Sequence, residues 1–106
     1  MAKIYEITAS QFTTLSKQQK LQLIDIREPN EYASENIENA ISMPLTQFDL
    51  AKLNELAKDN TLVFHCLSGM RTVNNAPKFA EVTSDEVYIL SGGLNGWKMS
   101  GLATKK

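Results

Sequence analysis

The run TLVFHCLSGMR, residues 61–71, joins an apolar strand to a short turn and the start of a helix. Residues 61–65 form the most apolar strand-length run, which predicts a central strand buried on both faces. The turn holds the only cysteine of the chain, Cys66, and Gly69, whose backbone can curl tightly. A helical pattern follows and extends to about Val82. The run therefore places a thiol at the point where a buried strand ends.

Similar units lie on both sides of this run. Strand patterns cover residues 4–7, 21–26, 40–43 and 87–90, and helical patterns cover 8–15, 29–32, 50–57 and the region around Trp97. Strands alternating with helices of this length predict an α/β fold. We expect a mainly parallel central sheet of about five strands, with helices on both faces. Ligands of such sheets bind beyond the carboxyl ends of the strands, where Cys66 falls.

Several local signals refine this expectation. Thr8 with Gln11, and residues 46–49, both match the capping box that begins a helix. Pro77 falls inside the helix expected after Arg71 and should bend or interrupt it. The final Lys105 and Lys106 are expected to fray.

Composition excludes several classes of protein. With 106 residues, the chain has the length of a single domain over 1–106. Its net charge of -1 gives no bulk attraction to nucleic acid or to an anionic membrane. The first residues lack the apolar core of a signal peptide, and no run is long enough to span a bilayer. We therefore expect a soluble protein of the cytoplasm, a reducing compartment that keeps a lone thiol free.

The cysteine count limits the chemistry. One cysteine excludes an internal disulfide and a multi-thiolate metal site. A short loop from Cys66 into a helix can turn backbone N–H groups inward as an anion-binding nest. The helix N-terminus, the Arg71 guanidinium and the Ser68 hydroxyl would add to it. These groups favour the thiolate, which is the nucleophilic form of cysteine.

Loop length bears on the substrate. Four residues separate Cys66 from Arg71, whereas the phosphatase signature has five residues between its cysteine and arginine. The shorter loop should form a smaller cradle, suited to a sulfur atom rather than a tetrahedral phosphate. A phosphatase or arsenate reductase is therefore the weakest alternative.

Three motifs, in order, resemble those of the rhodanese-like sulfurtransferases. Residues 66–71, CLSGMR, resemble the active loop C-x-x-G-x-R of that family. Residues 25–32, DIREPNEY, resemble its D-x-R-x-x-x-E-[FY] segment, and residues 90–101, LSGGLNGWKMSG, resemble its L-x-G-G-x-x-x-W-x-x-x-G ending. One departure is Asn39, where the family usually has glycine, and asparagine tolerates a left-handed backbone. The chain is identified as a single-domain member.

The resemblance implies a thiosulfate sulfurtransferase with a persulfide mechanism. Cys66 would take a sulfane sulfur from a donor such as thiosulfate and pass it to cyanide, a thiol or a protein cysteine. No metal and no organic cofactor is implied. Substrate contacts would come from the remaining residues of the loop: Leu67, Ser68, Gly69, Met70 and Arg71.

Other residues near the site have structural alternatives. Asp25 and Arg27 would lie behind the loop, where a hydrogen-bonded or ion-paired structural role fits equally well. His65 should face away from Cys66, because adjacent strand residues point to opposite faces. We expect it to pack or to hydrogen-bond rather than to form a Cys-His dyad. Gly92, Gly93 and Trp97 are expected to shape a turn and to pack.

Two further functional alternatives remain at this point. The chain could be a protein-persulfide carrier with weak thiosulfate activity, loaded from a protein sulfur donor. It could also be a non-enzymatic interaction domain of the same fold, although such domains usually lose the nucleophile.

Overall fold

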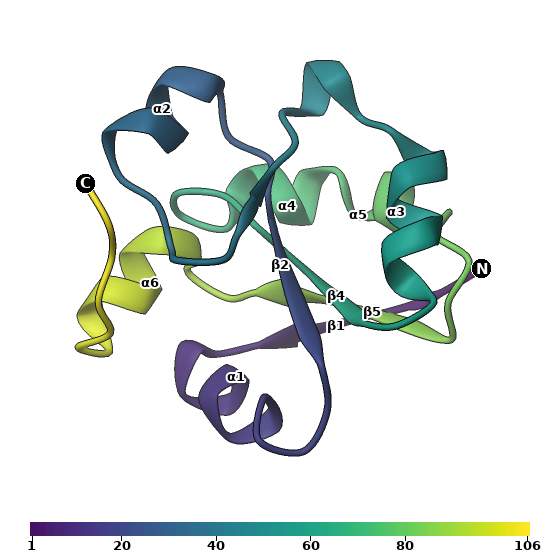
Figure 1. Ribbon diagram of the computed structural model, residues 1–106, viewed down its shortest axis with the longest axis horizontal. Coiled ribbons are helices and arrows are strands. Elements are labelled where there is room, and N and C mark those ends of the chain that lie inside the picture. The colour runs from purple at the N-terminus through teal and green to yellow at the C-terminus, as the bar shows by residue number, and fades with distance from the viewer.

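A computed structural model describes residues 1–106, and its centre is one five-stranded sheet (Figure 1). The strands are β1 (Lys3–Ile7), β2 (Leu21–Asp25), β3 (Ile41–Ser42), β4 (Thr61–His65) and β5 (Glu86–Leu90). Their spatial order is β1-β5-β4-β2-β3, and every neighbouring pair is parallel. The predicted α/β fold is confirmed, with the apolar strand β4 in the middle of the sheet.

Helices cover both faces of this sheet (Figure 1). They are α1 (Ala9–Leu15), α2 (Pro29–Ser34), α3 (Leu50–Ala57), α4 (Met70–Asn74), α5 (Ala76–Phe79) and α6 (Gly93–Met99), with a 3-10 turn η1 (Leu45–Gln47). Phe64 of β4 stacks on Phe79 of α5 in one core cluster, with ring centroids 4.1 Å apart. Val63 enters the other cluster, with Trp97 of α6. Successive β4 side chains thus enter opposite layers of the core, as a strand buried on both faces requires.

The capping signals have two different outcomes. Thr8 and Gln11 form the predicted reciprocal capping box at the start of α1. The signal at residues 46–49 is misplaced, because residues 45–47 form η1 and Asp49 caps α3. The Asp49 carboxylate accepts the Lys52 N–H at 3.1 Å, so the acid side chain satisfies a free donor of the first turn.

Pro77 interrupts the helix that follows the cysteine loop, as predicted. The single helix expected to about Val82 is two short helices, which meet at Asn75 with φ -112° and ψ 13°. Pro77 stands in the first turn of α5, where a missing N–H breaks no helical bond. The second helix ends at Phe79, three residues before the expected end.

Backbone hydrogen bonds hold Lys105 near the carboxyl end of the chain, so the prediction that it is frayed is wrong. Its backbone forms an isolated antiparallel bridge with Asn36, with N–O distances of 2.8 and 2.7 Å. Asn39 adopts the left-handed conformation anticipated for it, with φ 72°. The bridge holds the segment between α2 and β3 at Asn36.

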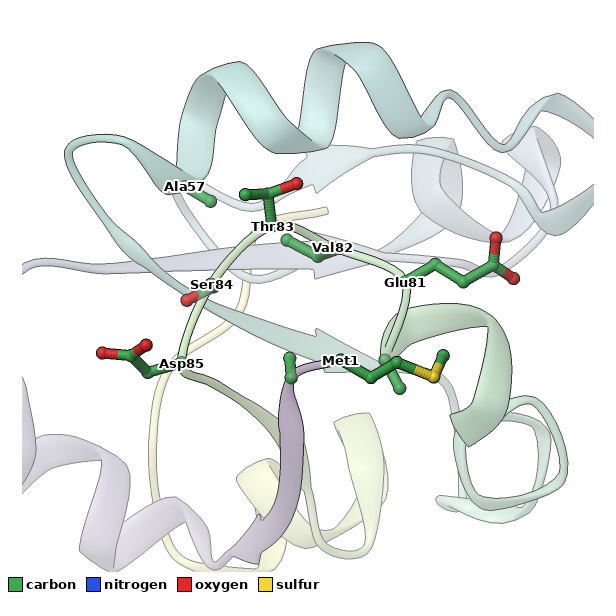
Figure 2. Close-up of a pocket in the computed structure, with 9 residues that line it drawn as sticks. Met1, Ala57, Glu81, Val82, Thr83, Ser84 and Asp85 are labelled. Carbon is green, nitrogen blue, oxygen red and sulfur yellow. The ribbon is translucent and has the colours of Figure 1, made fainter.

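The largest surface hollow has a volume of about 640 Å³ and is drawn in Figure 2. It is lined by Met1 and Ala2, which lead into β1, by Ala57, and by residues 80–85, which lead into β5. These are the amino ends of strands, whereas Cys66 follows the carboxyl end of β4. The hollow contains no cysteine or histidine.

Candidate active site

The Cys66 thiol lies at the carboxyl end of β4 and has no exposed surface. Its side chain belongs to the core cluster of Phe64, and the backbone then turns sharply through residues 67–69. Gly69 has φ 100°, a backbone conformation that favours glycine, and its N–H donates to the Cys66 sulfur with an N–Sγ distance of 3.1 Å. One backbone N–H of the loop is therefore turned inward toward the sulfur, as the loop sequence predicted.

Thr72 provides a second polar group beside the sulfur. Its buried hydroxyl lies 3.8 Å from Cys66 Sγ and donates a 2.8 Å hydrogen bond to the Gly69 carbonyl. Thr72 therefore contacts both Cys66 and the glycine at which the loop turns. Sequence reasoning missed this residue, because its hydroxyl approaches the sulfur only after the loop and α4 fold back.

Backbone N–H groups at the start of α6 donate hydrogen bonds to the carbonyl groups of the loop. The Leu94 N–H donates to the Cys66 carbonyl at 2.8 Å, and the Asn95 N–H donates to the Leu67 carbonyl at 2.9 Å. Gly93 lies against the same two carbonyl groups, and a Cβ there would stand 2.8 Å from the Leu67 carbonyl carbon. The predicted turn lies at Gly92, which has φ 77° and precedes α6, and the close approach of Gly93 to the loop is new.

Arg71 closes the loop but does not project freely into it. Its two terminal nitrogens donate to the Glu31 carboxylate of α2, at 2.9 and 3.0 Å. This pairing lowers the pKa of Glu31 to about 2 and raises the pKa of Arg71. Glu31 also accepts the Glu28 N–H at 3.0 Å, which caps α2. Although Glu31 stands in the second motif, nothing in the sequence pairs it with a residue 40 positions away.

Asp25 and Arg27 form a buried ion pair that makes no hydrogen bond with Cys66. The Arg27 guanidinium meets the Asp25 carboxylate at 2.8 to 3.1 Å and donates to the Glu35 carbonyl at 2.7 Å. Asp25 pairs in register with His65 of β4. The pair therefore supports the segment after β2, which is the structural alternative given above.

His65 forms no dyad with the cysteine. Its Nδ1 lies 3.3 Å from the Cys66 carbonyl, and its Nε2 is buried without a hydrogen-bond partner, 3.8 Å from the Asp25 carboxylate. Burial lowers the pKa of His65, so the ring is neutral near pH 7. The predicted packing and hydrogen-bonding role is confirmed.

Three exposed apolar side chains lie at the mouth of the loop. Leu67, Met70 and Val73 are 39%, 68% and 50% exposed, and we call these three residues the apolar rim. A hollow of about 280 Å³ lies beside the rim. Its lining consists of Glu6, Ser68, Gly69, Met70, Val73, Asn74, Ser91 and Gly92. Glu6 is its only charged residue, and the Ser68 side chain makes no hydrogen bond within the protein.

The donor set of the site is small and centres on one thiol. No group of three His, Cys, Asp or Glu side chains is placed to hold a metal ion. The site presents one thiol with a backbone donor and a hydroxyl beside it, which suits attack on an electrophilic sulfur.

None of the helices has the length and apolar character needed to cross a membrane.

Comparisons with known proteins agree with this arrangement. Residues 8–100 match the family described as Rhodanese-like domain. An uncharacterised protein of Synechocystis is 35% identical over 92 residues, or 87% of this chain and 51% of its own. The chain therefore spans about half the length of that relative.

Two further likenesses cover most of both chains. The thiosulfate sulfurtransferase GlpE of Actinobacillus pleuropneumoniae is 29% identical over 92% of this chain and 89% of its own. The solved BH2092 protein of Bacillus halodurans has a TM-score of 0.79 at 22% identity, over 95% of this chain and 76% of its own, which shows the shared fold. The fold, the loop geometry and the family match lead to one conclusion: the chain belongs to the rhodanese-like family.

Proposed function

We propose that the protein is a sulfurtransferase in which Cys66 carries the transferred sulfur as a persulfide. The observation that carries this proposal is the 3.1 Å contact of the Gly69 N–H with the Cys66 sulfur, inside a loop of the family's form. Membership of the rhodanese-like family and likeness to a relative named thiosulfate sulfurtransferase support it. A single rhodanese-like domain over 1–106 and a reducing compartment such as the cytoplasm belong to the same proposal.

The reaction has two nucleophilic steps. The Cys66 thiolate attacks the outer sulfur of a donor such as thiosulfate, the S–S bond of the donor breaks, and sulfite leaves with the bonding pair. The acceptor, which is cyanide, a thiol or a protein cysteine, then attacks the outer sulfur of the Cys66 persulfide. That attack releases the Cys66 thiolate, so the enzyme returns to its starting state. No metal and no organic cofactor takes part.

The residues of the loop have different roles in this reaction. The Gly69 N–H stabilises negative charge on sulfur in both the thiolate and the persulfide states. Arg71 holds the end of the loop through its ion pair with Glu31. Leu67, Ser68 and Met70 form the exposed wall that substrates first meet.

Mass spectrometry tests the proposal directly. Incubation with thiosulfate should add the mass of one sulfur atom to Cys66, and cyanide should remove it with formation of thiocyanate. Cys66→Ser should lose both the adduct and the thiosulfate:cyanide activity. Ser100→Ala, which changes an exposed hydroxyl with no side-chain partner, is the matched control and should keep both. Activity that survives Cys66→Ser would rule the proposal out.

A persulfide carrier is the second candidate, favoured by the lone cysteine. With no second thiol in the chain to resolve the persulfide, the sulfur on Cys66 must leave to another molecule. A carrier would load from a protein donor, such as a cysteine desulfurase, faster than from thiosulfate. Comparing the two loading rates separates the candidates. A purely non-enzymatic interaction domain would load from neither donor.

A further inference from the structure

His65 contains the one buried side-chain nitrogen or oxygen atom of the protein that has no hydrogen-bond partner, Nε2. Its side chain has no exposed surface and lies directly before Cys66, at the end of β4. A buried polar atom without a partner destabilises a fold, whereas an apolar side chain would fill the same space without that cost. What distinguishes histidine from an apolar side chain here is its other ring nitrogen, Nδ1.

Nδ1 of His65 lies 3.3 Å from the Cys66 carbonyl oxygen, which also accepts the Leu94 N–H at 2.8 Å. A carbonyl oxygen has two lone pairs, so it can accept a hydrogen bond from both donors. Nδ1 can donate only if it carries the ring proton, and two acceptors in contact would repel each other. The contact therefore assigns the proton of the neutral ring to Nδ1, which leaves Nε2 as an unpaired acceptor.

The Asp25 carboxylate does not reverse this assignment. Its Oδ2 atom is 3.8 Å from Nε2 of His65, which is beyond hydrogen-bond distance. Both carboxylate oxygens already accept hydrogen bonds from Arg27, whose guanidinium and backbone N–H approach them at 2.8 to 3.1 Å. Because the guanidinium charge offsets that of the carboxylate, Asp25 attracts a proton to Nε2 only weakly.

The direction of the Cys66 carbonyl also fixes the direction of the Leu67 N–H. The peptide bond between these two residues is trans, so its C=O and N–H groups point in opposite directions. Since the carbonyl is held toward His65 and the start of α6, the Leu67 N–H points away from them. No carbonyl group of the protein accepts this N–H. It is therefore available to a negative charge in the loop.

We propose that His65 is a positioning residue for sulfur transfer: its Nδ1–H holds the Cys66 carbonyl, so that the Leu67 N–H faces the negative charge on the transferred sulfur. His65 acts through this peptide group and forms no hydrogen bond with the sulfur itself. Its hydrogen bond also polarises the peptide, which strengthens the N–H as a donor. This inference rests on the proposed function, because it presumes that Cys66 accepts sulfur.

The position of the ring proton is a direct test, because the chain contains one histidine and its signals need no assignment. Long-range ¹H–¹⁵N correlation spectra show which ring nitrogen carries the proton. We expect Nδ1 to carry it above pH 6.5, where the ring is neutral. A proton on Nε2 would overturn the inference, because Nδ1 could then donate nothing to the Cys66 carbonyl.

Three substitutions at position 65 separate the donor from the volume of the ring. His65→Asn keeps a side-chain N–H close to the position of Nδ1, His65→Gln places one close to that of Nε2, and His65→Leu keeps only apolar volume. His65→Asn should retain most of the rate at which thiosulfate loads Cys66. His65→Gln and His65→Leu should load about tenfold more slowly, a smaller loss than the ~100-fold that removal of a direct donor causes.

Stability provides a comparison that a merely structural role of His65 would not survive. His65→Leu removes the unpaired Nε2, so it should unfold in urea at no lower concentration than the wild type and yet load more slowly. Val82→Ala, which truncates a buried side chain in the segment that leads into β5, is the matched control. It should lose stability and load Cys66 at the wild-type rate.

The backbone amide resonance of Leu67 reports on the peptide group itself. Loading of Cys66 with sulfur should shift this resonance in the wild type and in His65→Asn, and should shift it less in His65→Leu. A resonance that loading does not move would overturn the inference, and so would equal loading rates in His65→Asn and His65→Leu. In both of those cases the wild type still carries sulfur, so the proposed function survives. Failure of the wild type to load from any donor overturns the function itself.

Discussion

Gly93 lies so close to Cys66 that a Cβ at position 93 would overlap the Cys66 carbonyl oxygen. The contact allows the Leu94 N–H to reach that oxygen at 2.8 Å. Gly93 also has φ 56°, a left-handed conformation that favours glycine. The active loop and the start of α6 are therefore a single packed unit, although they are distant in the sequence.

Gly93→Ala should disrupt this unit. The added methyl group must push the loop carbonyls away, so sulfur loading of Cys66 should fall at least about tenfold and stability by about 1–3 kcal/mol. Gly101→Ala is the matched control, because Gly101 has φ 83° but nothing within 4 Å of its Cβ position. It should lose stability only through backbone strain and should load normally. Equal loading by the two variants would show that the close approach of Gly93 does not matter.

Thr72→Val should slow sulfur loading while the protein stays folded. Valine keeps the shape of the side chain but removes the hydroxyl that lies 3.8 Å from Cys66 Sγ and bonds the Gly69 carbonyl. Loss of that bond at a buried site should cost about 1–3 kcal/mol of stability. Thr72→Ser keeps the hydroxyl and should retain most of the loading rate. Stopped-flow or quenched mass measurements of loading would reveal any failure of serine to rescue.

His65 should make the protein less stable as the solution becomes mildly acidic. Burial lowers the pKa of His65 below 6.5, its usual value, so the unfolded chain binds a proton there before the folded protein does. Stability is therefore greatest above pH 6.5 and declines as the pH falls from 6.5 toward the lowered pKa. His65→Asn removes this group and should flatten urea-unfolding stability over that window. A slope identical to that of the wild type would assign the effect to other groups.

Glu31 should also make the protein less stable as the pH falls, but over a lower pH range than His65. Its pKa falls from 4.5 in the unfolded chain to about 2 in the pair with Arg71. The stabilisation it provides is complete above pH 4.5 and is lost as the pH falls from 4.5 toward 2. Glu31→Gln should therefore be less sensitive to acid over this range in circular-dichroism titrations. Glu55→Gln, from an exposed pair, should titrate like the wild type.

Local patterns in the sequence predicted the architecture because each strand and helix carries its own signal. The apolar run 61–65 marked the central strand, and Thr8 with Gln11 marked the start of α1. The errors lie where two signals compete. At residues 46–49, the Asp49 carboxylate caps better than the Thr46 hydroxyl, and Pro44 supports a preceding 3-10 turn.

The site was predicted only as far as it is contiguous in the chain. Cys66, Gly69 and Arg71 lie within six consecutive residues, in the loop and the first turn of α4, so their spacing is visible in the sequence. Glu31 and Thr72 were missed for a different reason. Their roles depend on which surfaces the fold brings together, and a bidentate pair between α2 and the loop leaves no periodic pattern.

The complete burial of the Cys66 side chain also has a practical consequence for handling the protein. A thiol with no exposed surface is shielded from bulky reagents, so size selects among its reaction partners before charge does. Large maleimides should label native Cys66 far more slowly than they label the unfolded chain. If Cys66 carries a persulfide as proposed, the same shielding would slow its oxidation by bulky oxidants.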